Sequence, residues 1–477
     1  MSIPAVICAV FVFWLLKQES KRSYKPSRAI WMPVIWASII GSKPLSVWLG
    51  LTPPSSASAG LSDDALLDKA LYIFLIFGGM VVLSKRRLNW QAIFRSNRWL
   101  FIFFLYLGAS IIWADSPFTS LKRWIKDVGN IVMALVVLTE EDPVQSVRAF
   151  FARCACILIP LSVLIVKYYP HISRRYSDWA DKILFVGIST DKNMFAMTLY
   201  CCALGLFWMW LQARDGLAGN RDKKAYWTYA VLLLLTGWLL VKAGSSTALT
   251  CVMVGGGILL AMRFPAIRSR VSKLGTYSFT AASVTLILKA TGLWTLIVTT
   301  FAHMVGRDPS FHGRTDIWQA LLKEDINPFL GVGYYSFWSP ERARRLSAKY
   351  FYTLNEAHNG YLETYLNSGV IGVLLLVVVV IWAARWIKKD VLTGASYGAL
   401  RLGFLLPAIF YGMSEAVFNR LSMLWFVLLL VMLEPPRRLQ EAESKVAEAV
   451  PEPNPSPHLN VGAAGLNSRS SISVTGQ

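Results

Sequence analysis

Charged residues are scarce in this sequence. Only 16% of its 477 residues are Asp, Glu, Lys or Arg, whereas about 25% are charged in a typical soluble domain. Hydrophobic residues reach 55%, and they gather in long apolar runs such as 370–384 and 421–433. A soluble fold of this size would interleave apolar and charged residues at the helix or strand period. The composition therefore indicates a polytopic membrane protein.

Cysteine is also scarce, and several familiar motifs are missing. The six cysteines lie inside apolar stretches, and Cys154 and Cys156 lack the spacing of a zinc or redox pair. We expect them to be buried small hydrophobic side chains. There is no P-loop, nucleotide-binding glycine fingerprint, H-E-x-x-H motif or Asp-x-Asp pair. These absences argue against ATP-driven work, and we expect no metal site and no cofactor.

Basic residues outnumber acidic ones by 48 to 28. They occur in small packets between apolar runs, which indicates membrane topology rather than nucleic-acid binding. The run 3–16 is followed, and not preceded, by basic residues, so we expect a retained helix whose N-terminus lies outside the cytoplasm. By the positive-inside rule, four basic packets mark cytoplasmic loops: 85–98, 214–224, 263–273 and 385–389.

A bilayer is crossed by about twenty mostly apolar residues, and the apolar runs predict an all-α, polytopic transmembrane helical bundle of about 12–13 spans within residues 1–433. Two long segments, 168–192 and 302–357, fall outside, and the second is expected to be a large periplasmic loop that carries short helices. Residues 434–477 are expected to form a disordered cytoplasmic tail. The expected spans are 2–16, 29–51, 65–84, 98–114, 119–139, 148–168, 193–213, 225–242, 246–262, 275–301, 359–384, 402–418 and 420–433.

Candidate functional residues concentrate on the expected external side. His358 immediately precedes the helix expected from 359, and Asn359 is suited to cap that helix. The positive end of the helix dipole disfavours imidazolium, and a neutral imidazole can act as a general base. A loop histidine that only supports the cap is the structural alternative.

A second group surrounds the start of a short amphipathic helix expected over 315–325. Arg314 precedes this helix, where its guanidinium group can bind a phosphate, or can simply be solvated. Tyr334 and Tyr335 follow two glycines in an aromatic run. Their rings can stack against sugars or belong to a membrane-interface belt.

Basic residues also lie near the outer ends of the expected spans. Lys192 begins one helix, and Arg123 and Lys126 lie in the outer part of 119–139. Cations inside a membrane usually face a cavity or a partner. They can bind an anionic ligand, or pair with Asp127.

A tight external turn contains Ser245 and Ser246. Amides and hydroxyls in such a turn can bind phosphate oxygens, although an ordinary hairpin turn is equally compatible. Lys289 and Glu415 are further ionisable residues within apolar runs. They can pair structurally, and the sequence assigns neither of them a role.

Four short strings occur in a fixed order along the chain. They are Gly244-Ser245-Ser246-Thr247, Gly313-Arg314-x-x-x-Trp318, Asn327-Pro328-x-x-Gly331-Val332-Gly333 and His358-Asn359-x-x-Leu362-x-x-x-Leu366-x-x-x-Gly369-x-x-Gly372. Together they resemble the O-antigen ligase and polymerase superfamily of bacterial envelopes, over about residues 60–430. The string Ser42-Lys43-Pro44-Leu45-Ser46-x-Trp48 is closest in look to bacterial exopolysaccharide polymerases.

The resemblance implies a metal-independent, inverting glycosyltransferase in the bacterial inner membrane, with its active site facing the periplasm. The donor would be an oligosaccharide on undecaprenyl diphosphate and the acceptor a glycan hydroxyl. His358 would be the base and Arg314 would bind the diphosphate, while Lys192 replaces a frequent arginine and loses its bidentate fork.

Within the superfamily we expect a polymerase of lipid-linked repeat units. The alternatives are a ligase that transfers glycan to a lipid A core, a flippase of the lipid-linked unit, and a catalytically silent scaffold. The partners expected from the resemblance are membrane lipid, a chain-length regulator and a flippase protein. We expect no binding of nucleic acid.

Overall fold

The structure is a computed structural model of the chain. It describes residues 2–21, 24–53, 65–177, 182–216, 223–273, 275–276, 284, 314–348 and 354–435. The expected tail lies outside the described residues apart from its first two positions, and the expected span 275–301 lies almost entirely outside them. The description below concerns the unit Met1–Pro436.

Helices dominate the described residues, which confirms the all-α fold class and the polytopic character of the chain. Six of these helices are long and apolar enough to cross a membrane. They are α1 (Ile3–Ser20), α5 (Leu66–Lys85), α9 (Pro143–Tyr168), α11 (Lys192–Gly216), α12 (Lys223–Ala243) and α19 (Gly360–Leu392).

Two bent helix pairs raise the number of candidate spans to eight if each pair counts as one span. The first pair joins α6 (Trp90–Ser96) to α7 (Arg98–Ala109) and η3 (Ser110–Trp113) with a bend of 84°. The second joins α13 (Ser246–Ala261) to α14 (Pro265–Arg270) and η5 (Val271–Lys273) with a bend of 106°.

The described helices therefore support six to eight spans rather than the 12–13 expected from the apolar runs. Two of the expected spans are helices of only ten residues, α2 (Trp31–Ile40) and α21 (Met423–Met432), which are too short to cross a bilayer alone. A third, α8 (Pro117–Leu138), is long enough but contains Lys122, Arg123, Lys126 and Asp127. A fourth, α20 (Ser396–Ser414), also fails the test of length and composition.

Short elements fill the connections. The segment 168–192, expected to lie outside the cytoplasm, contains an antiparallel hairpin of two strands, in which Arg174 pairs with Phe185. The large loop contains two short helices in its described part, as expected. These elements are η1 (Arg28–Ile30), α3 (Leu45–Trp48), α10 (Pro170–Ser173), β1 (Arg174–Ser177), β2 (Lys182–Phe185), α17 (Arg314–Leu322) and α18 (Pro340–Ser347).

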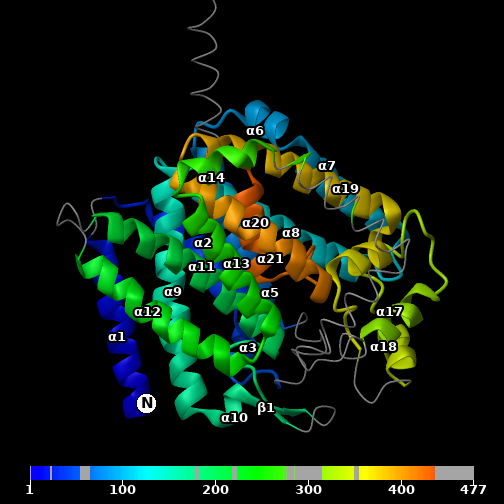
Figure 1. Cartoon of the computed structure of the whole chain (residues 1–477). Coiled ribbons are helices and arrows are strands. Elements are labelled where there is room, and N and C mark those ends of the chain that lie inside the picture. The colour runs from blue at the N-terminus through cyan, green and yellow to red at the C-terminus, as the bar shows by residue number, and fades with distance from the viewer. Residues whose placement is uncertain are drawn as a thin grey trace, which may run out of the picture. The chain divides into compact units, whose positions relative to one another are not determined.

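Contacts between helix ends show which connections lie on the same side of the bundle. Ser2 and Tyr169 form a hydrogen bond at one end of α1 and α9, and Tyr24 lies 2.9 Å from the Ser146 hydroxyl at the other end. In Figure 1, α6 and α14 lie at the upper edge of the picture, and α10 and β1 lie at the lower edge. The basic packets around 86 and 268 therefore lie on the same side, as the charge alternation predicts.

The centre of the bundle is packed by aromatic rings of α9, α20 and α21. The Phe151 and Phe404 rings stack with centroids 5.6 Å apart, and Phe150 packs edge-on against Phe426 at 5.5 Å. The six cysteines are free, five are buried and Cys8 is half-buried. This confirms the expected burial for five of the cysteines, which pack as small hydrophobic side chains, whereas Cys8 is partly accessible.

The start of α19 is shaped by a cap and a kink. The Asn359 side chain accepts hydrogen bonds from the backbone N–H groups of Tyr361 and Leu362 at 3.0 and 3.1 Å, which confirms the expected N-cap. Further along, Gly369 adopts φ +62° and interrupts the helix. A Cβ atom there would lie 2.1 Å from the Phe329 carbonyl oxygen. Only glycine allows the loop before the kink to press against it.

Candidate active site

His358 lies in a short connection before α19, and neighbouring residues fix its backbone. Its φ of +47° is uncommon for a residue other than glycine. The preceding Ala357 donates its N–H to Glu363 at 2.9 Å, and its carbonyl accepts a hydrogen bond from Trp318 Nε1 at 2.9 Å. With Asn359 capping α19, this left-handed residue is held from both sides.

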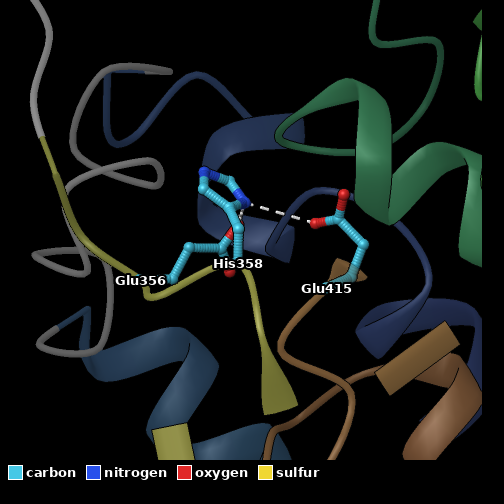
Figure 2. Close-up of side chains that lie close together, drawn as sticks. All are labelled: Glu356, His358 and Glu415. Atoms are coloured by element: carbon cyan, nitrogen blue, oxygen red, sulfur yellow. Dashed lines mark hydrogen bonds and ion pairs between the residues drawn. The ribbon is translucent and has the colours of Figure 1, made fainter. Parts of the chain in front are cut away.

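Two carboxylates face one ring nitrogen of His358. Its Nδ1 lies 2.9 Å from Glu356 Oε1 and 3.3 Å from Glu415 Oε2. Figure 2 shows that the other nitrogen, Nε2, points away from both carboxylates. When a carboxylate accepts a hydrogen bond from the Nδ1–H group of the neutral ring, Nε2 carries no proton and retains its lone pair. In this arrangement the Nε2 atom of His358 can accept the proton of a nearby hydroxyl group.

Glu415 joins several of the segments that the sequence analysis singled out. It follows the C-terminal end of α20 and is only 5% exposed. Besides His358, its carboxylate accepts hydrogen bonds from Arg314 Nη2 at 2.8 Å and from Asn193 Nδ2 at 3.0 Å. Burial alone would raise the pKa of Glu415, but His358 and then Arg314 outweigh burial and hold that pKa below its usual value. Glu415 is therefore an ionised carboxylate at neutral pH.

Arg314 begins α17 and is held against the end of α20. In addition to Glu415, its guanidinium group donates to the Ser414 carbonyl. The Ser414 hydroxyl lies 3.2 Å from the Thr247 hydroxyl, so the turn that precedes α13 is next to Arg314. Within this turn the Ser245 side chain caps α13 by accepting from the Ala248 N–H group. Ser246 is the exposed first residue of α13.

A second ion pair lies on the other side of His358. Arg420 pairs with Glu356, and its Nε lies 3.2 Å from the Tyr335 hydroxyl. The guanidinium group of Arg123 lies 4.5 Å from the centre of the Tyr335 ring, and its Nη1 donates to the Tyr335 carbonyl at 3.1 Å. A continuous series of contacts thus leads from Arg123 on α8 to His358.

Three other expected site residues lie at the edge of this cluster or away from it. Tyr334 is 2% exposed and donates its hydroxyl to Asp127 at 3.0 Å, so its buried ring cannot stack against a sugar in this structure. The Lys126 ammonium group lies 5.1 Å from the Tyr72 ring on α5. Lys192 is the first residue of α11, and it is the next residue, Asn193, whose hydrogen bond to Glu415 at 3.0 Å anchors that helix end to the cluster.

The carboxylates and the histidine have the donor types that a metal ion accepts. Donor atoms of Glu356, His358 and Glu415 all lie within 4.8 Å of one another. However, each carboxylate already pairs with an arginine, Arg420 in one case and Arg314 in the other. A divalent cation would add two positive charges to a group that is already neutralised. The arrangement therefore suits an oriented base better than a metal centre.

Four contributors to this cluster were not proposed as site residues from the sequence: Asn193, Glu356, Glu415 and Arg420. Only Glu415 stood out, as an ionisable residue in an apolar run, which is a feature typical of functional residues in membrane proteins. Asn193 and Glu356 lie beside the proposed residues Lys192 and His358, and Arg420 lies in a separate segment that no spacing in the sequence connects to them.

The comparisons with known proteins cover the segment that contains much of this cluster. The O-antigen ligase family matches residues 229–377, which include Arg314 and His358. Over 306 residues the chain is 28% identical to "Exopolysaccharide production protein ExoQ" of Rhizobium meliloti (strain 1021). The chain is therefore similar to the O-antigen ligase and polymerase superfamily, as its ordered strings indicate. The match to the relative covers 61% of this chain and 65% of that protein's length.

Proposed function

We propose that this protein is an integral membrane glycosyltransferase that polymerises oligosaccharide repeat units carried on undecaprenyl diphosphate. The observation that carries the proposal is the geometry of His358, whose Nδ1 faces Glu415 and whose Nε2 is turned away, beside Arg314. Similarity to the O-antigen ligase family and to an exopolysaccharide production protein supports the reaction class. We place the reaction on the periplasmic face, because the cluster lies on the side opposite the basic packets.

The proposed step transfers a glycosyl group with inversion. His358 Nε2 takes the proton of the acceptor hydroxyl, and the hydroxyl oxygen forms a bond to the anomeric carbon of the donor. The bond from this carbon to the diphosphate oxygen breaks, and its electron pair leaves with the diphosphate. The leaving group is already activated, so it needs positive charge rather than ATP or a metal ion. Arg314 and Lys192, which begin α17 and α11, supply that charge together with the helix N-termini.

A polymerase is favoured over other members of the superfamily by the relative, whose name refers to exopolysaccharide production. The segment around Lys43 helps to hold the connection before α11 in place. Lys43 donates its ammonium group to the Ile172 carbonyl at 2.7 Å and its N–H group to the Ile188 carbonyl at 2.8 Å. These bonds anchor the segment that leads into α11. A ligase is the second candidate, because the matching family is described as O-antigen ligase.

The test is His358→Ala, compared with the substitution His171→Ala at an exposed residue of α10. Removal of a general base typically lowers a rate by about 10²–10⁴. We expect His358→Ala to abolish polymer at unchanged protein level, and His171→Ala to make normal polymer. The measurement is the amount and length of lipid-linked and surface glycan in cells that produce each variant.

The species that accumulates identifies the reaction. A polymerase defect leaves single repeat units that an external glycosidase can digest. Long chains that remain on the lipid carrier would indicate a ligase instead, and single units protected from the glycosidase would indicate a flippase. Normal polymer from His358→Ala would show that this histidine is structural and would overturn the proposal.

A further inference from the structure

Glu415 contacts the base, the cation and a third helix at once. Its Oε2 atom lies 3.3 Å from His358 Nδ1 and 3.0 Å from Asn193 Nδ2, while Oε1 lies 2.8 Å from Arg314 Nη2. Both oxygens are therefore occupied by groups from segments that are far apart in the chain. Glu415 also lies outside the segment 229–377 that matches the ligase family.

We propose that Glu415 is the positioning residue of this site: its carboxylate holds His358 in the Nδ1–H tautomer and anchors Arg314 beside it. The inference rests on the proposed function, in which His358 acts through Nε2. In the opposite tautomer the proton would be on Nε2, and His358 could not accept the proton of the acceptor hydroxyl. Glu415 itself need not touch the substrate.

Glu356 is the obvious competitor for this role, because its Oε1 atom lies only 2.9 Å from the same nitrogen. Two observations favour Glu415. Its contact with Nδ1 has the geometry of a hydrogen bond, and its side chain is 6% exposed, compared with 16% for Glu356. In addition, Glu356 lies two residues from His358 in the same connection and pairs with Arg420, whereas Glu415 links His358 to Arg314.

Charged groups on every side of the ring must be considered in the test. His358 is faced by Glu356 and Glu415, and these carboxylates are paired with Arg420 and Arg314. Replacing Glu415 by Gln keeps the shape but removes the carboxylate that accepts the Nδ1–H hydrogen bond. The Gln amide can instead donate to Nδ1, which places the proton on Nε2, where His358 can no longer take the proton of the acceptor hydroxyl.

The experiment measures the polymerisation rate against donor concentration for detergent-solubilised wild type, Glu415→Gln and Glu356→Gln. The donor is the lipid-linked oligosaccharide extracted from cells that lack this protein, and rates are expressed per folded protein from size-exclusion chromatography. For Glu415→Gln we expect a maximal rate about 10- to 100-fold lower, with a smaller change in KM. For Glu356→Gln we expect a smaller fall in the maximal rate.

A wild-type maximal rate for Glu415→Gln would overturn the inference, and so would a larger fall in the maximal rate of Glu356→Gln. If Glu415→Gln does not fold, Glu415→Asp is measured instead. It keeps the carboxylate but shortens the side chain, so its maximal rate should fall because the carboxylate no longer reaches both His358 and Arg314. A wild-type rate for Glu415→Asp would contradict the anchoring of Arg314. Failure of the proposed function can be distinguished from failure of this inference. If the proposed function is wrong, His358→Ala makes normal polymer, and this result does not depend on the Glu415 variants.

Discussion

At the scale of single residues, the position of His358 depends on one tryptophan. Trp318 Nε1 donates to the Ala357 carbonyl at 2.9 Å, directly before the histidine. Trp318→Phe removes this donor and retains most of the ring. The loss of one hydrogen bond costs about 0.5–1.5 kcal/mol. A displaced base also lowers the rate of a proton transfer, and we expect polymerisation to be at least about tenfold slower.

The matched control is Trp382→Phe, because Trp382 Nε1 donates to the Ser96 carbonyl at 2.7 Å on α19 but away from the site. It deletes the same group from the same residue type. We expect normal polymerisation from this control, measured as polymer formed per folded protein. Equal rates for the two variants would show that Trp318 does not position His358.

The sequence could identify His358, Arg314 and Asn359, because these residues belong to ordered strings with a local meaning. Asn359 is recognisable as a cap from its position alone, and the structure confirms it. Glu415 and Arg420 could not be assigned, because their role arises only when the end of α20 meets α17 and the connection before α19. Tyr334 shows the opposite case. An aromatic run suggests a binding platform, but burial against Asp127 makes this ring part of the core.

At the scale of helices, Arg401 connects the ends of α19, α20 and α21. Its side chain is completely buried, and its Nη1 pairs with Asp390 at 2.6 Å and Glu434 at 3.0 Å. Its Nε donates to the Val431 carbonyl at 2.7 Å, near the end of α21. Arg401→Leu would remove the positive charge that these two buried carboxylates share. Breaking a buried pair in this way costs about 3–5 kcal/mol.

We therefore expect Arg401→Leu to lower the melting temperature of the detergent-solubilised protein markedly. The control is Arg263→Leu, which removes an ion pair with Asp215 whose side chains are 34% and 50% exposed. Such surface pairs contribute about 0–1 kcal/mol, so the control should melt near the wild-type temperature. Similar melting of both variants would contradict the role of Arg401.

Helix positions follow from apolar runs, whereas bends do not. The runs located α5, α9, α11 and α12 to within a few residues. The 84° bend between α6 and α7 and the interruption at Gly369 depend on tertiary packing, which hydropathy does not describe. Every residue of α21 is buried, and half of the ten residues of α2 are buried, so both helices are apolar without being long. This is why the apolar runs predict more spans than the described helices support.

At the scale of the whole described unit, the two sets of connections should lie on opposite sides of the membrane. The cluster around His358 includes α17, whereas η5 follows α14 within a basic packet. Basic connections remain in the cytoplasm, because moving them across the membrane is disfavoured. Gln319 on α17 and Ser272 in η5 are both exposed and suitable for labelling.

Cysteine is introduced at each of these positions in a variant whose native cysteines have been replaced. In intact spheroplasts, an impermeant thiol reagent should label Gln319→Cys and should leave Ser272→Cys unlabelled. After permeabilisation both should react, which shows that the second thiol is accessible and not merely buried. Labelling of Ser272→Cys alone in intact spheroplasts would invert the topology. It would place His358 in the cytoplasm, where a polymerase of externally presented repeat units could not act.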